Sequence, residues 1–167
     1  MRVSSPALAL FRPAVCAVVL AATATLAHAV DRRVPSQYPT IQAAVNAAAS
    51  NGDRVLVANG NYIGVGNRDI DLGTKNLVIQ SESNNPTACV LDCQYLGRGF
   101  RIHGNQTSAT VIRGFSIYRG YAPSGFGGGI LNYPTAAIIE NCRFISCQAS
   151  IDGGGVDNTG GTVRNCT

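Results

Sequence analysis

A glycine run occurs twice toward the C-terminal end of the chain, each time with the same neighbours. It reads Gly-Gly-Gly-Ile at 127–130 and Gly-Gly-Gly-Val at 153–156, an offset of 26 residues. A second phrase, a short apolar run next to Gly or Asn, recurs around it: Gly114, Asn141 and Asn165 are separated by 27 and 24 residues. Short apolar runs punctuated by Gly and Asn at such a period are typical of a strand-based solenoid, in which each unit buries its apolar face only by stacking on its neighbours.

A repeat of about two dozen residues has room for three strands of roughly 3–5 residues and three turns. The tripeptides 100–102, 115–117 and 142–144 each place two apolar residues around a polar one, which predicts that the outer two point inward and the middle one into water. These middle residues are Arg101, Ser116 and Arg143. Because parallel crossover connections are right-handed almost without exception, we predict an all-β chain that forms a right-handed, single-stranded parallel β-helix, a solenoid of three sheets.

Gly114, Asn141 and Asn165 are predicted to share one turn position, where residues that tolerate positive φ are favoured. Cys142 and Cys166 follow the two asparagines, so they occupy equivalent positions one coil apart, with Cα atoms about 4.8 Å from each other. That separation allows a disulfide, which an exported protein would be able to form. A stacked pair of free thiols is the favoured interpretation, because buried cysteine behaves as a small hydrophobic residue.

Residues 1–29 are predicted to be a signal peptide rather than part of the fold. Arg2 and Arg12 supply its basic part, residues 14–26 its apolar run, and Ala-His-Ala its cleavage site. The prediction is therefore export, to the extracellular space, to the outer membrane and cell surface, or to the periplasm. The remaining chain, 30–167, is long enough for one domain.

The domain is predicted to begin with an amphipathic capping helix over about 40–50, followed by coils over about 53–167. Thr40 is the expected N-cap and Gly52 the expected stop. The helix would shield the first coil, whose apolar interior and strand edge would otherwise be open. At Thr167 the chain stops within a coil, so the expectation is a domain that is truncated at its C-terminus. The apolar stripe of the helix consists of Ile41, Ala44, Val45 and Ala48.

Short runs rich in Val, Ile, Leu and Phe predict the early strands. A turn is predicted at 59–62, where the chain reads Asn-Gly-Asn-Tyr, and surface loops at 82–87 and 103–109. The predicted strands are 53–58, 69–72, 77–80, 90–92 and 100–102.

Composition argues against several classes of partner. Charged residues make up 13% of the chain, against a usual level of about 25%. Loss of Arg2 and Arg12 with the signal peptide lowers the formal net charge from +4 to +2, so no basic stripe is left for a nucleic acid. No transmembrane segment is expected in the mature region. No cofactor is expected either, since no Cys/His spacing matches a zinc site.

The residues at 38–45, Tyr-Pro-Thr-Ile-Gln-Ala-Ala-Val, resemble the start of bacterial right-handed parallel β-helix repeat proteins of the pectate-lyase-like superfamily. Gly-Asp-Arg-Val-Leu-Val-Ala at 52–58 and Gly-Asn-Tyr at 60–62 extend the resemblance. The later part is similar to the repeats of polymorphic outer membrane proteins, in which Phe-x-x-Asn and Gly-Gly-Ala-Ile phrases alternate. Residues 144–147 end in Cys where that family has Asn. The resemblance implies the fold more strongly than an activity, because lyases, hydrolases, adhesins and passenger domains share it.

Polysaccharide lyases of this superfamily hold Ca²⁺ with a carboxylate cluster and use an Arg or Lys as the base, so the resemblance implies Ca²⁺ if the chain is a lyase. Asp152 and Asp157 flank the second glycine run and are the candidate metal ligands. The alternative is that Asp152 caps the turn and Asp157 faces solvent. Three charged residues are predicted to share one position in three successive coils, namely Arg113, Glu140 and Arg164. A ladder of ion pairs is the favoured role for them, ahead of a catalytic base. No catalytic residue is identified.

Tyr118, Arg119 and Tyr121 are the candidate ligand-binding residues, because they are expected to project from a loop between coils and the two tyrosines offer flat faces on which sugar rings stack. His103 is interpreted as a surface residue, since no acidic or nucleophilic partner is apparent in the sequence.

The favoured function is a non-catalytic, secreted or cell-surface scaffold, adhesin-like or passenger-like, that binds a polysaccharide or a cell-surface glycan. The alternative is the N-terminal part of an extracellular polysaccharide lyase or glycoside hydrolase whose catalytic coils lie beyond Thr167.

Overall fold

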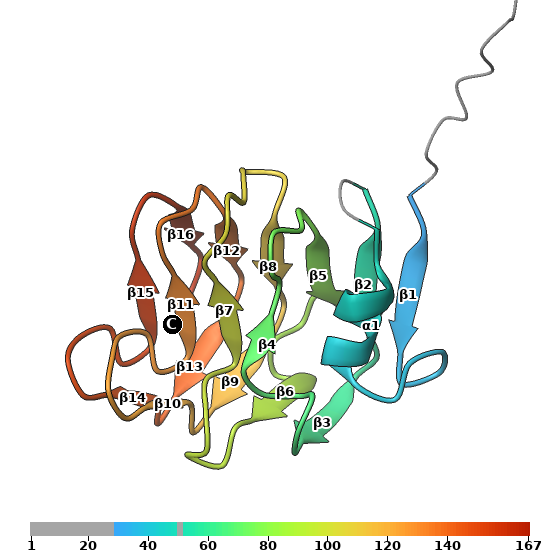
Figure 1. The fold of residues 1–167 in the computed structure, drawn as a ribbon. Helices are drawn as coiled ribbons and strands as arrows, with labels where there is room; N and C mark the ends of the chain where they lie inside the picture. Colours follow the sequence, from blue (N-terminus) through green and yellow to red (C-terminus); the bar gives the residue numbers. More distant parts are fainter. Residues whose placement is uncertain (1–28, 50–51) are drawn as a thin grey trace, which may run out of the picture.

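The computed structural model describes residues 29–49 and 52–167, which form a parallel β-solenoid of about five turns (Figure 1). The signal peptide predicted for 1–29 therefore lies almost entirely outside the described residues. The elements are β1 (Asp31–Val34), α1 (Ile41–Ala47), β2 (Arg54–Val57), β3 (Gly60–Ile63), β4 (Ile70–Asp71), β5 (Val78–Ser81), β6 (Cys89–Asp92), β7 (Phe100–Ile102), β8 (Val111–Arg113), β9 (Ser116–Tyr118), β10 (Tyr121–Ala122), β11 (Ile130–Asn132), β12 (Ile138–Glu140), β13 (Arg143–Ile145), β14 (Gln148–Ala149), β15 (Val156–Asn158) and β16 (Thr162–Arg164).

Three parallel sheets form the walls of the solenoid, as predicted. Sheet A has the order β1-β2-β5-β8-β12-β16, sheet B the order β13-β9-β6-β3, and sheet C the order β15-β11-β7-β4. A fourth, two-stranded sheet pairs β10 with β14. The third coil comprises β8 to β11 and the fourth comprises β12 to β15, and these names are kept below. Phe115 and Cys142 occupy stacked positions in these two coils, because the N–H of Arg143 donates to the carbonyl of Phe115 at 2.9 Å.

The predicted turn position is confirmed by the backbone angles. φ is 79° at Gly114, 50° at Asn141 and 53° at Asn165. Gly114 has a second reason to lack a side chain, since a Cβ there would lie 2.9 Å from the Cα of Asn84. The Asn141 side chain donates to the Asn84 carbonyl at 2.6 Å, so an amide ties together two coils that are not neighbours.

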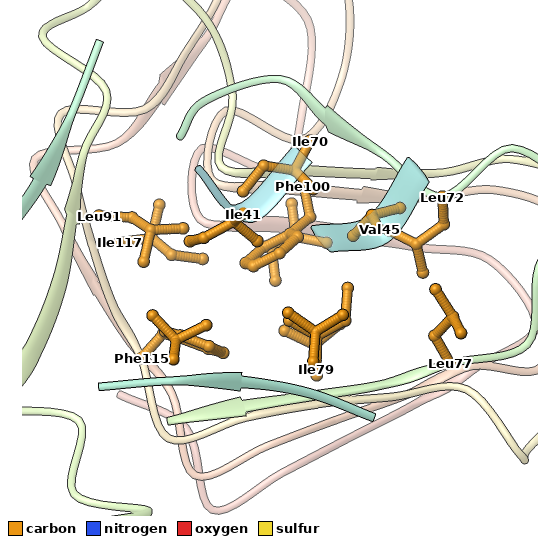
Figure 2. Packing of buried hydrophobic residues seen from close by; sticks show 14 of the residues in the cluster. Ile41, Val45, Ile70, Leu72, Leu77, Ile79, Leu91, Phe100, Phe115 and Ile117 are labelled. Carbon is orange, nitrogen blue, oxygen red and sulfur yellow. The ribbon is translucent and has the colours of Figure 1, made fainter. Parts of the chain in front are cut away.

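The interior is filled mainly by apolar side chains. Phe100 and Phe115 are fully buried, with ring centroids 5.7 Å apart and planes tilted by 54°. Figure 2 shows Phe100 in the middle of the interior, with Ile41 and Ile70 beside it. The favoured state of the cysteines is confirmed as well, because Cys142 and Cys166 are free thiols.

One inside–outside assignment is wrong. Ser116 was predicted to face water, but it is only 2% exposed. Its hydroxyl donates to the carbonyl of Pro86 at 2.7 Å, so the loop between β5 and β6 covers it. Alternation along a strand identifies which residues point outward, but it does not reveal a loop that covers the outer face. Arg101 and Arg143 are partly exposed, as predicted.

Two early strands differ from the sequence prediction. β1 was not predicted, and it forms the first rung by pairing with β2 in parallel. The turn predicted at 59–62 is instead strand β3, which pairs with β6. Tyr62 explains this difference, because its side chain is 8% exposed and its hydroxyl donates to the carbonyl of Ala58 at 2.8 Å. The corner is therefore confined to the residues between β2 and β3.

The capping helix is confirmed, although it is shorter than predicted. The N–H of Ala43 donates to the Thr40 hydroxyl at 3.2 Å, and α1 ends at Ala47, before Gly52. Lys75 accounts for the early stop, since its ammonium donates to the carbonyls of Val45, Asn46 and Ala48 at 2.8 Å each. The carbonyls at the end of the helix are thus satisfied by a side chain from a later coil. Within the described part of the chain, no helix has the length and apolar character to cross a membrane.

Asp53 joins the cap to the first coil. Its carboxylate accepts the N–H of Val30 at 3.0 Å, the N–H of Ala49 at 2.8 Å and the Arg32 guanidinium at 2.9 Å. Burial by itself raises the pKa of Asp53, but these donors outweigh it and hold the pKa below 3.8, the ordinary value. The charged form is therefore more favourable in the folded protein than in the unfolded chain.

The substitution Asp53→Ala is expected to lower the free energy of unfolding by about 2–3 kcal/mol, because three donors lose a charged acceptor. In the wild type the stabilisation is complete above the ordinary aspartate pKa and is lost as the pH falls through the lower folded-state pKa. Urea unfolding at a series of pH values tests both points. Glu82→Ala is the control, since its ion pair with Arg33 is exposed and expected to contribute under about 1 kcal/mol. Equal losses at the two sites would contradict the role given to Asp53.

Candidate functional site

A groove of about 400 Å³ lies on the outer face of sheet C, over β11 and β15. These two strands are neighbours in the sheet (Figure 1). Volumes of this order are typical of small-ligand sites. Its position follows from strand alternation, because Leu131 points outward between two buried neighbours and Asp157 is paired with it in register. The lining residues are Phe126, Leu131, Tyr133, Asp152, Asp157 and Thr159.

The groove has an apolar side and a polar side, and each comes from one coil. Phe126, Leu131 and Tyr133 belong to the third coil, while Asp152, Asp157 and Thr159 belong to the fourth. Leu131 is paired in register with Asp157. Phe126 lies beside Asp152, because the N–H of the next residue, Gly127, donates to the Asp152 carbonyl at 3.1 Å. Tyr133 lies beside Thr159, because the N–H of Thr159 donates to the carbonyl of Asn132, which precedes Tyr133, at 2.9 Å. The 26-residue offset of the glycine runs therefore also relates the three pairs.

The aromatic side chains of the groove are available to a ligand. Phe126 is 42% exposed and Tyr133 is 53% exposed. The wall behind them is firmly held, since the buried Asn132 donates to Asn158 at 2.6 Å and accepts from the Thr135 hydroxyl. The groove therefore combines exposed rings with a rigid backbone, which reduces the entropy lost on binding.

The glycine runs bring the two coils into direct backbone contact beside the groove. The N–H groups of Gly128 and Gly129 donate to carbonyls of the second run at 2.9–3.1 Å, and that of Gly127 donates to the Asp152 carbonyl just before it at 3.1 Å. A Cβ at Gly129 would lie 2.6 Å from the Phe144 ring. Residues with side chains would push the coils apart, so the runs set the spacing between the two sides of the groove.

The predicted metal ligands Asp152 and Asp157 both line the groove, and Asp152 also accepts the N–H of Gly153 at 2.6 Å, as the turn-capping alternative requires. Calcium binding by these two carboxylates stays a prediction. Within the described residues no group of three or more His, Cys, Asp or Glu side chains is placed to hold a metal ion.

The predicted ligand-binding residues Tyr118, Arg119 and Tyr121 do not line the groove. Tyr118 ends β9 in sheet B, and Tyr121 begins β10. Arg119 is held within the fold: its Nε donates to Asp92 at 2.9 Å, and its guanidinium lies 4.9 Å from the centroid of the Tyr118 ring. The hydrogen bond from Arg119 is the main reason that the pKa of Asp92 is lowered.

His103 has an acidic partner that the sequence interpretation missed. Its Nε2 lies 3.0 Å from both carboxylate oxygens of Asp71, and Arg101 is 3.7 Å from the same carboxylate. Burial raises the pKa of Asp71, but the hydrogen bond with His103 and other donors outweigh it and lower the pKa overall. This cluster lies one coil before the groove on the outer face of sheet C, since Arg101 is paired in register with Leu131.

The predicted charge ladder is confirmed on sheet A. Arg113 lies 3.4 Å from Glu140, and Arg164 lies 2.6 Å from the other oxygen of the same carboxylate. Arg113 also donates to Gln80 at 2.9 Å. The three charged residues therefore stabilise the contacts between coils and are not directed to the groove.

A second hollow of about 450 Å³ lies beside α1, with Gln42, Arg68 and Asp69 among its lining residues. Its polar side chains already have partners in the fold. Gln42 accepts the N–H of Asp71 at 2.7 Å, and Arg68 donates to Gln94 at 3.2 Å. The groove on sheet C, whose rings and carboxylates are turned to solvent, is the stronger candidate for a binding site.

Comparisons with protein-family models, with curated proteins and with solved structures find no match. The parallel β-helix fold that the resemblance implied is present, whereas the narrower kinship with pectate-lyase-like proteins or polymorphic outer membrane proteins stays a prediction. The case for the site therefore rests on its geometry.

Proposed function

We propose that this chain is an exported, non-catalytic β-solenoid domain that binds carbohydrate in the groove between β11 and β15. The observation that carries the proposal is the pairing of two exposed aromatic rings, Phe126 and Tyr133, with oxygen acceptors on the opposite side. Sugar rings have an apolar face that packs on aromatic side chains and hydroxyl groups that donate to carboxylates. A groove with one side of each kind matches both properties.

The arrangement of the walls supports a scaffold function. Stacked coils present an extended face, and consecutive rungs of sheet C place their outward residues in rows along the solenoid axis. Beyond Leu131 the row continues to Arg101 and Asp71. A linear glycan lying along this row would contact several coils at once.

The chemistry of the groove favours binding over catalysis. Among its lining residues only Asp152 and Asp157 carry carboxylates, and both come from the fourth coil. A lyase would need a base such as Arg or Lys beside the sugar acid, and neither residue type lines the groove. The enzymatic alternative is tested by incubating the protein with polygalacturonate and calcium, where ultraviolet absorbance from unsaturated ends would contradict the non-catalytic proposal.

The substitution Tyr133→Ala is expected to raise the Kd for a bound oligosaccharide about tenfold, equal to about 1.4 kcal/mol, because one stacking surface is lost. Tyr95→Ala is the matched control, since this tyrosine is 39% exposed and lies outside the groove. A glycan array identifies the ligand and titration calorimetry measures both variants. If Tyr121→Ala weakens binding and Tyr133→Ala does not, the site is the one predicted from the sequence.

A further inference from the structure

We infer that the groove selects sugars that carry a positive charge, namely the amino sugars of a deacetylated polysaccharide. The inference rests on the proposed carbohydrate-binding function and adds the chemical class of the ligand. Its basis is a pair of carboxylates that have no ion-pair partner among the described residues and lie beside aromatic rings, on the outer face of sheet C.

The two carboxylates of the groove differ from most others in the protein. The sequence has nine Asp and Glu residues, and six of them form ion pairs with Arg or His. Within residues 29–49 and 52–167, neither Asp152 nor Asp157 has such a partner. The paired residues are Asp31, Asp53, Asp71, Glu82, Asp92 and Glu140.

The nearby arginines form no ion pair with these two carboxylates. Arg98 donates from Nε to the Phe126 carbonyl at 3.0 Å, and Arg101 lies 3.7 Å from Asp71. Neither contact neutralises Asp152 or Asp157. A ligand ammonium would therefore meet two carboxylates that no described cation occupies, whereas a uronate or sulfate group would be repelled by them.

The apolar side of the groove strengthens the preference for a cation. An ammonium group near the faces of Phe126 and Tyr133 gains cation–π attraction, and the same rings pack on the apolar face of the sugar. A hydrogen bond from an ammonium to a carboxylate is roughly twice as strong as a neutral one. An amino sugar uses all of these contacts, while its N-acetylated form loses those that depend on charge.

The test compares a glucosamine oligosaccharide with its fully N-acetylated counterpart by titration calorimetry on the full chain. The wild type is expected to bind the charged form at least about tenfold more tightly, with an affinity that falls as salt is added. The double substitution of Asp152→Asn and Asp157→Asn is expected to remove this preference. Glu82→Gln makes the same kind of charge change on the exposed surface and is expected to retain it. Circular dichroism verifies that each variant is folded.

Each outcome decides a separate claim. Equal affinities for the two oligosaccharides, or a preference that survives in the double variant, would overturn the inference while leaving the carbohydrate-binding function intact. An equal loss in Glu82→Gln would show that the attraction comes from net charge and not from the groove, and would also overturn it. Failure to bind either oligosaccharide or any other glycan would remove the proposed function together with the inference.

Discussion

Replacement of Phe100 by alanine is expected to lower the free energy of unfolding by about 3–5 kcal/mol. Its side chain is fully buried at the centre of the solenoid, and its ring is packed against that of Phe115. The loss combines the transfer free energy of the ring, the cost of the cavity and the contact between the two rings. The cavity cannot close readily, because the surrounding walls are fixed by hydrogen bonds between coils.

Urea unfolding followed by circular dichroism measures this effect. Phe126→Ala provides the same chemical change on the surface, where the ring is 42% exposed, and is expected to alter stability by only about 0.5 kcal/mol. It should weaken carbohydrate binding instead. Similar destabilisation by the two substitutions would contradict the placement of Phe100 in the interior.

The substitution Gly128→Ala is expected to destabilise the protein by about 3 kcal/mol or more. The added methyl group would clash with backbone atoms, and a change of side-chain rotamer cannot relieve such a clash. A Cβ at this position would overlap the Gln148 carbonyl and lie 2.6 Å from the carbonyl oxygen of Gly154. The third and fourth coils would have to separate, with loss of hydrogen bonds between the glycine runs. Carbohydrate binding should fall as well, since the groove spans these coils.

Gly154→Ala is the matched control in the second glycine run. The nearest atom to a Cβ there is the Cys147 carbonyl oxygen at 3.1 Å, which a small adjustment relieves. Thermal unfolding of the two variants should therefore show a much lower Tm for Gly128→Ala. If both variants melt at the same temperature, the close approach of the coils does not limit stability.

The repeated phrases were sufficient to predict the architecture, because a solenoid follows from local features that recur. Gly114, Asn141 and Asn165 were predicted to share a turn, and their positive φ values confirm it. The stripe of α1 and the ladder on Glu140 were predicted for the same reason, since each depends on spacing along the chain. These features require no knowledge of the loops.

The errors have the opposite origin, since each involves a contact that the repeat does not encode. Ser116 is covered by a loop of irregular length, and Tyr62 turns an expected corner into a strand by entering the interior. Lys75 ends α1 from a distant position in the sequence. His103 forms a hydrogen bond with Asp71, which lies in a coil where the repeat is still irregular.

Only half of the candidate site was predicted from the sequence. Asp152 and Asp157 were named, but their neighbours were not. The signal was present, because a shift of 26 residues converts Phe126 into Asp152 and Leu131 into Asp157. Applying the period to the exposed residues, as well as to the glycines, would have aligned the two sides of the groove. Tyr118 and Tyr121 were chosen for their rings and for an expected place in a loop, whereas they lie in strands β9 and β10.

The register between the third and fourth coils also has a consequence for the evolution of the binding surface. Because side chains alternate along a strand, the residues that face outward differ from those that fill the interior. The outward set comprises positions 126, 131 and 133 and their partners 26 positions later. The residues that contact a ligand can therefore change in one coil at a time without a change in the fold. Duplication of a single coil would lengthen the contact surface by one rung and add three new positions to it.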